Sequence, residues 1–263
     1  MIPDLSPLDL EADPKGCCAR LYESDAVRWL LDDQLHPGGE RLTLRLARLA
    51  DVAPGARVID VACGSGATAL LLARELGCVA VGVDLGARAI EQARHATRAG
   101  ERASFLLGDA EALPVPDASF DVALSECSLC TFPDKPRAIA EMARVVRPGG
   151  SIAIADVTAD LDALPAQLRS AAARVACVAD ARSAGEYAAL LRDAGCAPLA
   201  TETHDAELRA MADRVEARLR VARMLAPAGD QRERIREAAA LARMAIDAIA
   251  RGTLGYALLT ARV

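Results

Sequence analysis

Eight cysteines are the side chains of this 263-residue sequence best suited to chemistry, because thiolates bind soft ligands and act as nucleophiles. Five of them fall in three remote segments: Cys17 and Cys18 in KGCCARLYES, Cys127 and Cys130 in SECSLCTFPDK, and Cys177 in RVACVADARSAGEY. A chain of this length has too few cysteines for a disulfide scaffold, so in a reducing compartment most should be thiols. Their placement is therefore more informative than their number.

The remaining cysteines have simpler explanations. Cys63 lies in a glycine-rich turn, Cys78 begins an apolar run, and Cys196 follows the end of a helical pattern. Free cysteine often serves as a small apolar filler, and we expect that role for all three. The side chains of the adjacent Cys17 and Cys18 are not expected to face the same way, so one of this pair should be a bystander.

Three carboxylates form a second set of candidates, since each lies at the end of a short apolar run. Asp60 lies in RVIDVA, Asp84 closes VAVGVD, and Asp109 follows ASFLL. A carboxylate in the position of Asp84 can accept hydrogen bonds from both ribose hydroxyls, and one in the position of Asp109 can accept from an adenine amino group. Such acids suit a ligand with a cationic amino-acid end, a ribose and an adenine, and they suit a pyrophosphate poorly.

A glycine-rich turn, DVACGSG at 60–66, joins the first apolar run to the helical pattern ATALLLAREL. Glycines there let the backbone approach a ligand closely, and the start of the helix offers unpaired N–H groups. With Ala69 in the third position, Gly64 and Gly66 also approximate a dinucleotide-binding turn, but the neighbouring acids disfavour that interpretation. A purely structural role for the acids, as helix or turn caps, remains open.

Seven short apolar runs predict the strands that position these groups. They cover residues 57–62, 79–84, 103–107, 120–125, 151–156, 198–204 and 255–262. Helical patterns separate the first five, which is typical of a parallel sheet with helices on both faces and a ligand beyond the carboxyl ends of the strands. A Pro/Gly-marked corner at 147–150 precedes the fifth run, and a charged amphipathic stretch from about Ala206 to Ile249 predicts helices inserted before the last strand.

We expect one domain, because two independent ones would strain a chain of this length. Its parts would be an N-terminal cap over 1–40, a ligand-binding α/β core over 41–204, and a helical insertion with the final strand over 205–263. The formal charge of −6 and the 3% aromatic content argue against nucleic acid and acidic membranes as partners. The acidic, proline-containing start does not resemble a signal peptide, and we expect a cytoplasmic protein with a small neutral or cationic partner.

Taken in order, these motifs resemble the class I S-adenosylmethionine (SAM) dependent methyltransferases. DVACGSG, VGVD, GDAEALPVPDASFD and EMARVVRPGG follow that family over about residues 40–200. The resemblance implies a Rossmann-like fold with a seven-stranded, mostly parallel sheet, and SAM as cofactor. It places the methionine part at the glycine turn, the ribose at Asp84 and the adenine at Asp109. The cofactor-binding residues that it implies are Asp60, Ala62, Gly64, Gly66, Asp84, Leu85, Asp109, Ala110 and Ser125.

A narrower resemblance, to the arsenite methyltransferases, involves the cysteines. Ser125-Glu126-Cys127 followed by Pro133-Asp134-Lys135 is similar to the loop after the fourth strand of that family. Ala155-Asp156-Val157 and then Cys177, ahead of a helix that ends in Ala194-Gly195, is similar to its next segment. The sequence departs from the family in having Glu126 where the family has asparagine and VADA after Cys177 where it has Gly-Gly-Ala. It is also short at its C-terminal end.

This resemblance implies that trivalent arsenic is held by Cys127, Cys177 and either Cys17 or Cys18. The arsenic lone pair would be the nucleophile, so no general base is needed. The three histidines, His36, His95 and His204, fall outside the motifs and are expected on the surface or in turns. Cys130 would either replace Cys127 or resolve a disulfide formed during turnover. The substrate would be a small molecule or metalloid, also in the form of a glutathione adduct, and the protein a monomer or homodimer.

Three alternatives remain open at this point. The first is a methyltransferase for a small organic acceptor such as a quinone precursor, with incidental cysteines and Glu126 as acid or base. The second is a structural zinc site built from Cys127, Cys130 and the N-terminal pair, although adjacent cysteines lack the usual two-residue spacing. The third is a non-catalytic protein that senses or sequesters a metalloid on the same fold.

Overall fold

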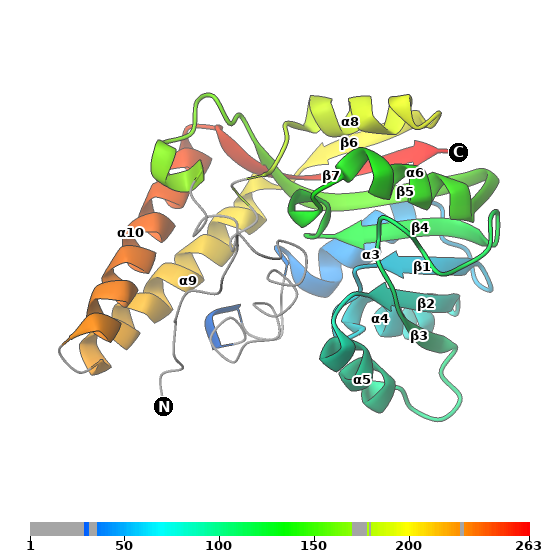
Figure 1. The fold of residues 1–263 in the computed structure, drawn as a ribbon, viewed down its shortest axis with the longest axis horizontal. Coiled ribbons are helices and arrows are strands. Elements are labelled where there is room, and N and C mark those ends of the chain that lie inside the picture. The colour runs from blue at the N-terminus through cyan, green and yellow to red at the C-terminus, as the bar shows by residue number, and fades with distance from the viewer. Residues whose placement is uncertain (1–28, 32–35, 170–177, 179, 227–228) are drawn as a thin grey trace.

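The strands of the protein form one mixed sheet (Figure 1) in a computed structural model that describes residues 29–31, 36–169, 178, 180–226 and 229–263. Within this part of the chain seven strands occur in the order β3-β2-β1-β4-β5-β7-β6. They are β1 (Arg57–Val61), β2 (Val79–Asp84), β3 (Ala103–Leu107), β4 (Phe120–Glu126), β5 (Val146–Ala159), β6 (Ala197–Thr203) and β7 (Leu254–Arg262). Only the β5–β7 and β6–β7 pairs are antiparallel. The predicted seven-stranded, mostly parallel sheet is confirmed.

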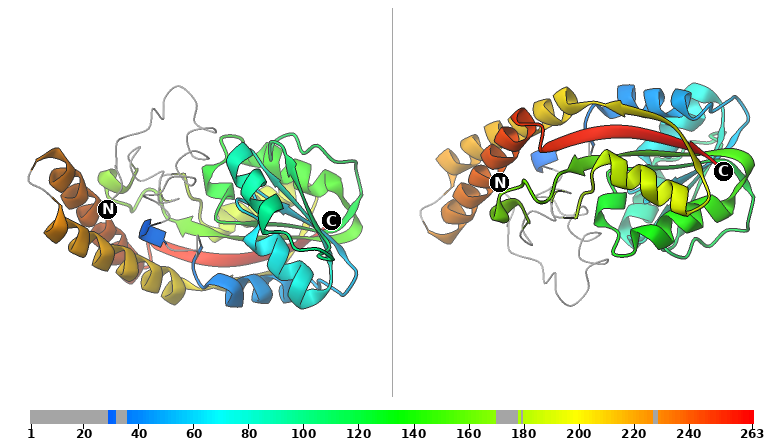
Figure 2. Two further views of the ribbon diagram at one scale, coloured as in Figure 1. Left: turned by 90° about the horizontal axis from the view of Figure 1, so that it is seen from below. Right: turned by 90° about the horizontal axis from the view of Figure 1, so that it is seen from above.

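Helices cover both faces of the sheet (Figure 2). Neighbouring residues of β1 point to opposite faces, so Val58 joins one apolar core and Ile59 the other. One core packs under α3, α4 and α5, and the other under α6 and α8. These helices are α3 (Gly39–Leu49), α4 (Ala67–Leu76), α5 (Ala87–Ala96), α6 (Lys135–Val145) and α8 (Ala184–Asp193). Burial on both sides explains why the central strands read as continuous apolar runs rather than alternating ones.

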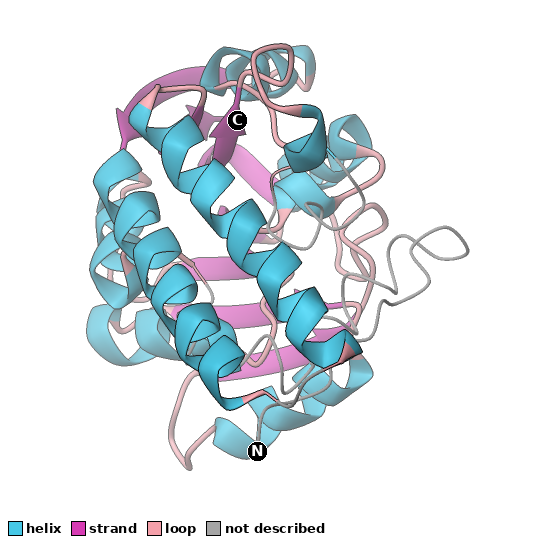
Figure 3. Cartoon of the chain, turned by 90° about the vertical axis from the view of Figure 1, so that its left-hand side faces the viewer, coloured by secondary structure: helices cyan, strands magenta, loops and turns pink. Residues whose placement is uncertain are grey.

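The predicted helical insertion is a pair of long helices, α9 (Asp205–Leu225) and α10 (Asp230–Ala250), which lie side by side beyond one end of the sheet (Figures 1 and 3). Their apolar residues make a small core of their own, which also receives Leu30. Arg218 of α9 donates hydrogen bonds to the carbonyls of Trp29, at 2.6 Å, and Leu30, at 3.2 Å. The pair therefore anchors the start of the described chain. No helix in the described ranges is long and apolar enough to cross a membrane.

The fifth strand begins earlier than its apolar run indicates. The Pro/Gly-marked segment 147–150 predicts a corner before the strand, yet β5 starts at Val146 and carries an irregularity there, where its pairing with β4 shifts register. Gly149 and Gly150 hold the bulged segment, because Gly149 donates to the carbonyl of Val263 at 2.8 Å and Gly150 accepts from its N–H at 3.0 Å. A Cβ atom on Gly150 would lie 2.5 Å from the Asp121 carbonyl oxygen, so only glycine fits.

Candidate functional site

A tight turn follows β1 at the carboxyl edge of the sheet. Ala62, Gly64 and Gly66 all adopt left-handed backbone conformations, with φ of 61°, 53° and 83°. The N–H of Cys63 donates to the Val83 carbonyl on β2 at 3.1 Å, which ties the turn to the neighbouring strand. Ala62 is notable because alanine rarely adopts this conformation, so the surrounding structure must hold it there.

The two glycines of the turn face different surroundings. A Cβ atom on Gly66 would lie 2.6 Å from the ring of Phe105 and 2.9 Å from Ala93, whereas one on Gly64 would meet no atom within 4 Å. Gly66 is thus required for packing of the helix start against the sheet. Gly64 borders open space on the side where a cofactor would approach the backbone.

Asp84, at the end of β2, fixes this turn with its carboxylate. One oxygen accepts from the Gly64 N–H at 2.8 Å, and the other accepts from the Gly86 N–H at 2.7 Å. The carboxylate therefore lies against the glycine turn. A carboxylate oxygen can accept two hydrogen bonds, which is the property that the predicted contact with ribose hydroxyls requires.

Asp60 is the side chain of this edge best suited to a cationic ligand. It is buried, and its Oδ2 atom has no hydrogen-bond partner among the described residues. Burial, reinforced by the negative charges of Glu126 and Asp84, raises the pKa of Asp60 well above its usual value. A buried, orphaned carboxylate among acids fits a ligand that carries a positive ammonium or sulfonium group, and SAM carries both.

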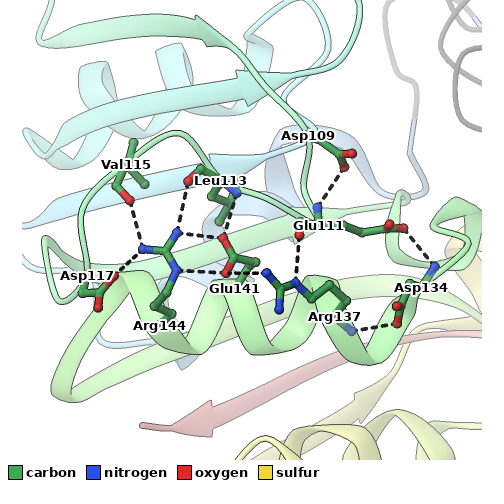
Figure 4. Close-up of polar contacts among 9 residues, drawn as sticks. All are labelled: Asp109, Glu111, Leu113, Val115, Asp117, Asp134, Arg137, Glu141 and Arg144. Carbon is green, nitrogen blue, oxygen red and sulfur yellow. Dashed lines mark hydrogen bonds and ion pairs between the residues drawn. The ribbon is translucent and has the colours of Figure 1, made fainter.

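Asp109 lies in the loop between β3 and β4, which polar contacts fasten to α6 (Figure 4). Asp109 accepts from the N–H of Glu111 at 2.9 Å, which shapes the turn. Further along, Arg144 of α6 donates to the carbonyls of Leu113 and Val115 and pairs with Glu141, whose carboxylate accepts from the Leu113 N–H at 2.8 Å. The loop that carries the predicted adenine contact is therefore held by α6 and by its own turn.

The other predicted cofactor residues lie around the same edge. Leu85 is 42% exposed and directly follows Asp84. Ala110 is partly buried against the core beneath α6. Ser125 is buried in β4, and its hydroxyl lies 2.6 Å from that of Ser128. Because the carboxyl ends of β1, β2, β3 and β4 meet at this edge, the structure brings these positions together.

Cys127 lies just beyond β4 in a strained conformation. Its φ is 49°, a left-handed value that a residue with a β-carbon rarely adopts. Its N–H donates to the carbonyl of Ala155 on β5 at 2.7 Å, and its Sγ lies 3.6 Å from the hydroxyl of Tyr256 on β7. The thiol is half-buried. Outliers of this kind persist where the surroundings over-determine them, and they cluster at functional sites.

Cys130, three residues further on, is buried instead. Its N–H donates to the Asp156 carboxylate at 3.0 Å, and its thiol also hydrogen-bonds to that carboxylate. Asp156 is itself fully buried, and burial raises its pKa. The described conformation of Cys130 thus faces the interior beneath the loop rather than the surface.

The remaining predicted cysteines divide into two groups. Cys63, Cys78 and Cys196 are free thiols, and burial raises the pKa of each, which fits their expected role as inert fillers. Cys17, Cys18 and Cys177 lie outside the described residues. Within the described ranges no three His, Cys, Asp or Glu side chains gather as a metal-ion site.

Glu126 is the centre of a polar cluster that the sequence did not reveal. Its carboxylate accepts from the hydroxyl of Thr68 on α4 at 2.7 Å and from that of Thr43 on α3 at 3.0 Å. His36 lies 3.9 Å from the same carboxylate, so one of the three histidines, all expected to be surface or turn residues, borders the site. A lone threonine in each helix gave no signal, because only the packing of α3 and α4 against each other and against the sheet brings these hydroxyls together.

Comparison with protein families matches a methyltransferase domain to residues 59–154. That range begins in β1 and ends within β5, so it includes the glycine turn, Asp84, Asp109 and Cys127. The family match therefore covers the edge of the sheet at which the predicted cofactor residues meet.

Three curated methyltransferases are similar in sequence to part of this chain, and each is matched over only part of its own length. Methyltransferase GfsG of Streptomyces halstedii is 42% identical over 48% of this chain and 46% of its own. The 27-O-demethylrifamycin SV methyltransferase of Amycolatopsis mediterranei is 35% identical over 62% of this chain and 61% of its own. The arsenite methyltransferase of Halobacterium salinarum is 33% identical over 72% of this chain and 51% of its own. The chain thus spans about half to three fifths of the length of these relatives.

Two solved structures share the fold across nearly the whole chain. The [4+2]-cyclase SpnF superposes with a TM-score of 0.77 at 26% identity, covering 94% of this chain and 96% of its own. A geranyl diphosphate methyltransferase in complex with SAM superposes with a TM-score of 0.69 at 19% identity, covering 96% of this chain and 92% of its own. Together with the family match they confirm the predicted fold and the resemblance of the chain to methyltransferases. Since one neighbour is named a cyclase, fold alone does not establish the reaction.

Proposed function

We propose that this chain, a class I SAM-dependent methyltransferase by family and fold, transfers the methyl group of SAM to trivalent arsenic held by cysteine thiolates. The observation that carries the proposal is the strained, half-buried Cys127 at the carboxyl end of β4. In this fold ligands bind beyond that edge of the sheet, so a thiol there is next to the acceptor position. Cys177 and one of Cys17 and Cys18 complete the proposed ligand set.

The similarity to the arsenite methyltransferase of Halobacterium salinarum supports this choice of acceptor, because among the relatives named above it extends over the largest share of the chain, 72%. Trivalent arsenic is soft and binds thiolates strongly. A site that offers sulfur ligands is therefore better suited to it than to a hard oxygen-rich acceptor.

In the proposed reaction SAM supplies an electrophilic methyl group on a sulfonium centre. Asp60, with its unpartnered oxygen, would stabilise the cationic end of the cofactor, and Asp84 would orient the ribose. Cys127 and the other thiolates would hold arsenic with its lone pair towards the methyl carbon. The lone pair would form the arsenic–carbon bond as the bond between the methyl carbon and the sulfonium sulfur breaks, so that S-adenosylhomocysteine leaves with that electron pair and arsenic passes from the trivalent to the pentavalent state. The protein then need not remove a proton, and positioning with exclusion of water supplies the rate.

Product analysis with purified protein tests this proposal. The protein is incubated with labelled SAM, arsenite and glutathione, and methylated arsenicals are separated by chromatography. We expect label in methylarsenicals, and Cys127→Ser should abolish it while SAM still binds. Cys196→Ser, a matched change of a buried cysteine remote from this loop, should leave turnover intact. Tight SAM binding without methylarsenicals in the wild type would refute the arsenic acceptor.

A small organic acceptor is the second candidate, and Glu126 is the observation that favours it. Its carboxylate lies beside Cys127 and could remove a proton from a hydroxyl nucleophile. Relatives named for rifamycin and for 2-methyl-6-phytyl-1,4-hydroquinone are of this kind. The same labelled SAM offered to a panel of phenols and hydroquinones tests it, with transfer to a phenol but not to arsenite as the supporting result.

A further inference from the structure

We propose that Tyr256 is a positioning residue that holds the Cys127 sulfur in place for the acceptor. The effect of Tyr256 on catalysis rests on the proposed function, because it requires that Cys127 hold the acceptor. The two residues lie 129 positions apart in the sequence, and their side chains meet at 3.6 Å between Sγ and the hydroxyl oxygen.

The sheet explains how they meet. Glu126, the last residue of β4, pairs with Ala155 of β5, and Tyr256 of β7 pairs with Val157 of the same strand. Cys127 and Tyr256 are therefore separated by β5 alone and lie at nearly the same level of the sheet. Its left-handed backbone, fixed by the hydrogen bond to the Ala155 carbonyl, directs the thiol across β5.

The tyrosine itself has little freedom to move. Its side chain is fully buried in the core beneath α3 and α4. Its N–H donates to the Asp205 carboxylate at 2.9 Å, and its carbonyl accepts from the N–H of His204 at 2.7 Å. Gly255 permits this approach, because a Cβ atom there would lie 2.6 Å from the Asp205 carboxylate.

A hydroxyl suits this position because it can both accept and donate. In the described state the thiol of Cys127 donates to the Tyr256 oxygen. When the sulfur has lost its proton to bind an acceptor, it has no hydrogen to donate, and the hydroxyl can turn its own hydrogen towards the sulfur. The Tyr256 hydroxyl can therefore hydrogen-bond to the Cys127 sulfur both before and after the sulfur binds an acceptor, whereas phenylalanine has no hydroxyl to do so.

The test compares Tyr256→Phe with Tyr187→Phe. Both tyrosines are fully buried, but the hydroxyl of Tyr187 bonds to backbone, donating to the Val157 carbonyl and accepting from the Arg182 N–H. We expect Tyr256→Phe to raise KM for arsenite about 3- to 10-fold, as loss of one hydrogen bond would, with little change in SAM affinity. Tyr187→Phe should leave both constants unchanged.

A second readout does not depend on turnover: the rate at which iodoacetamide labels Cys127, resolved by mass spectrometry. Tyr256→Phe should slow this labelling severalfold, because the thiolate loses a hydrogen-bond donor, and Tyr187→Phe should not. Unchanged labelling in Tyr256→Phe overturns the inference. Slower labelling in a protein that never methylates arsenite would instead leave the positioning role intact and refute the proposed acceptor.

Discussion

The hydroxyl of Thr68, in the first turn of α4, donates a 2.7 Å hydrogen bond to the carboxylate of Glu126 at the end of β4. This bond joins the helix that follows the glycine turn to the residue beside Cys127. The cofactor and acceptor sides of the proposed site are therefore mechanically linked. Since the Glu126 side chain is only 4% exposed, the link is protected from solvent.

Glu126→Gln separates the two candidate functions. Glutamine keeps an oxygen that can accept from the threonine hydroxyls but cannot act as a base near neutral pH. If arsenic is the nucleophile, the rate of methyl transfer should fall by no more than about 3-fold, the effect of weakening a hydrogen bond. Loss of a general base would instead cost about 100-fold or more, and that result, measured by initial rates, would favour an organic acceptor.

Gly64→Ala and Gly66→Ala should damage different properties. In Gly66→Ala the new methyl group would clash with the ring of Phe105, and the alanine would have to adopt a left-handed backbone conformation. We therefore expect this substitution to lower the free energy of unfolding by about 2–4 kcal/mol. Gly64→Ala should cost only about 1 kcal/mol, for backbone conformation alone, yet weaken SAM binding because its methyl group points into open space at the turn.

Urea unfolding and calorimetric titration with SAM measure the two effects. Equal losses of stability in the two glycine variants would contradict the packing described for Gly66. Unchanged SAM affinity in Gly64→Ala would mean that the cofactor does not approach this turn closely.

In the absence of SAM, the contribution of Asp60 to the free energy of unfolding should fall as the pH rises. Its pKa is raised in the folded protein, so the folded state holds the proton more tightly than the unfolded state does. The associated stability is present below the ordinary pKa and is lost as pH rises through the folded value. Relative to wild type, Asp60→Asn should thus gain stability as the pH rises above the ordinary aspartate pKa towards the raised value of the folded protein.

Denaturant unfolding at several pH values measures this difference. Asp213→Asn is a suitable control, because Asp213 is half exposed and pairs with Arg209 on the surface of α9. Parallel stability curves for wild type and Asp60→Asn would contradict the raised pKa. SAM binding should be lost in Asp60→Asn, since the orphaned carboxylate oxygen is replaced by an amide.

Arg144 should matter for both stability and cofactor binding (Figure 4). Arg144 hydrogen-bonds to the buried carboxylate of Glu141 and lowers its pKa. It also donates to the carbonyls of Leu113 and Val115, in the segment that follows Asp109. Arg144→Met should lower the free energy of unfolding by about 2–3 kcal/mol, because Glu141 loses its hydrogen-bonded arginine and keeps only the 3.9 Å ion pair with Arg137. The Glu141 contribution is present above the ordinary glutamate pKa and fades as pH falls through the lowered value.

Arg147→Met provides the comparison, because Arg147 is exposed and its ion pair with Asp121 lies at the surface. Its loss should cost less than about 1 kcal/mol. SAM affinity, measured by calorimetry, should fall in Arg144→Met and not in Arg147→Met. Equal effects of the two substitutions would show that the loop does not depend on the buried pair.

The fold was predictable because its signals are local. Apolar runs, glycine turns and helical periodicity place all seven strands to within a few residues, except that β5 begins at Val146, where the backbone pairs through a bulge. Asp60, Asp84 and Asp109 could be selected as candidates for the same reason, since each lies at or just beyond the end of a strand at one edge of the sheet.

The companions of these residues could not be predicted from the sequence. Tyr256 meets Cys127 only because β7 inserts next to β5, and Thr43 meets Glu126 across 83 positions because α3 packs on the sheet. Such contacts depend on tertiary packing, for which a single tyrosine or threonine leaves no pattern. The buried orientation of Cys130 towards Asp156 is of the same kind.

Thiolate-held arsenic as the methyl acceptor is tested most directly by methyl transfer from labelled SAM to arsenite–glutathione. The wild type is compared with Cys17→Ser, Cys18→Ser, Cys127→Ser, Cys130→Ser and Cys177→Ser, and SAM binding is checked for each. We predict that Cys127→Ser, Cys177→Ser and one of the two N-terminal variants lose turnover while all variants bind SAM. Full turnover in Cys127→Ser, or a wild type that binds SAM and never methylates arsenite, would contradict the proposed site.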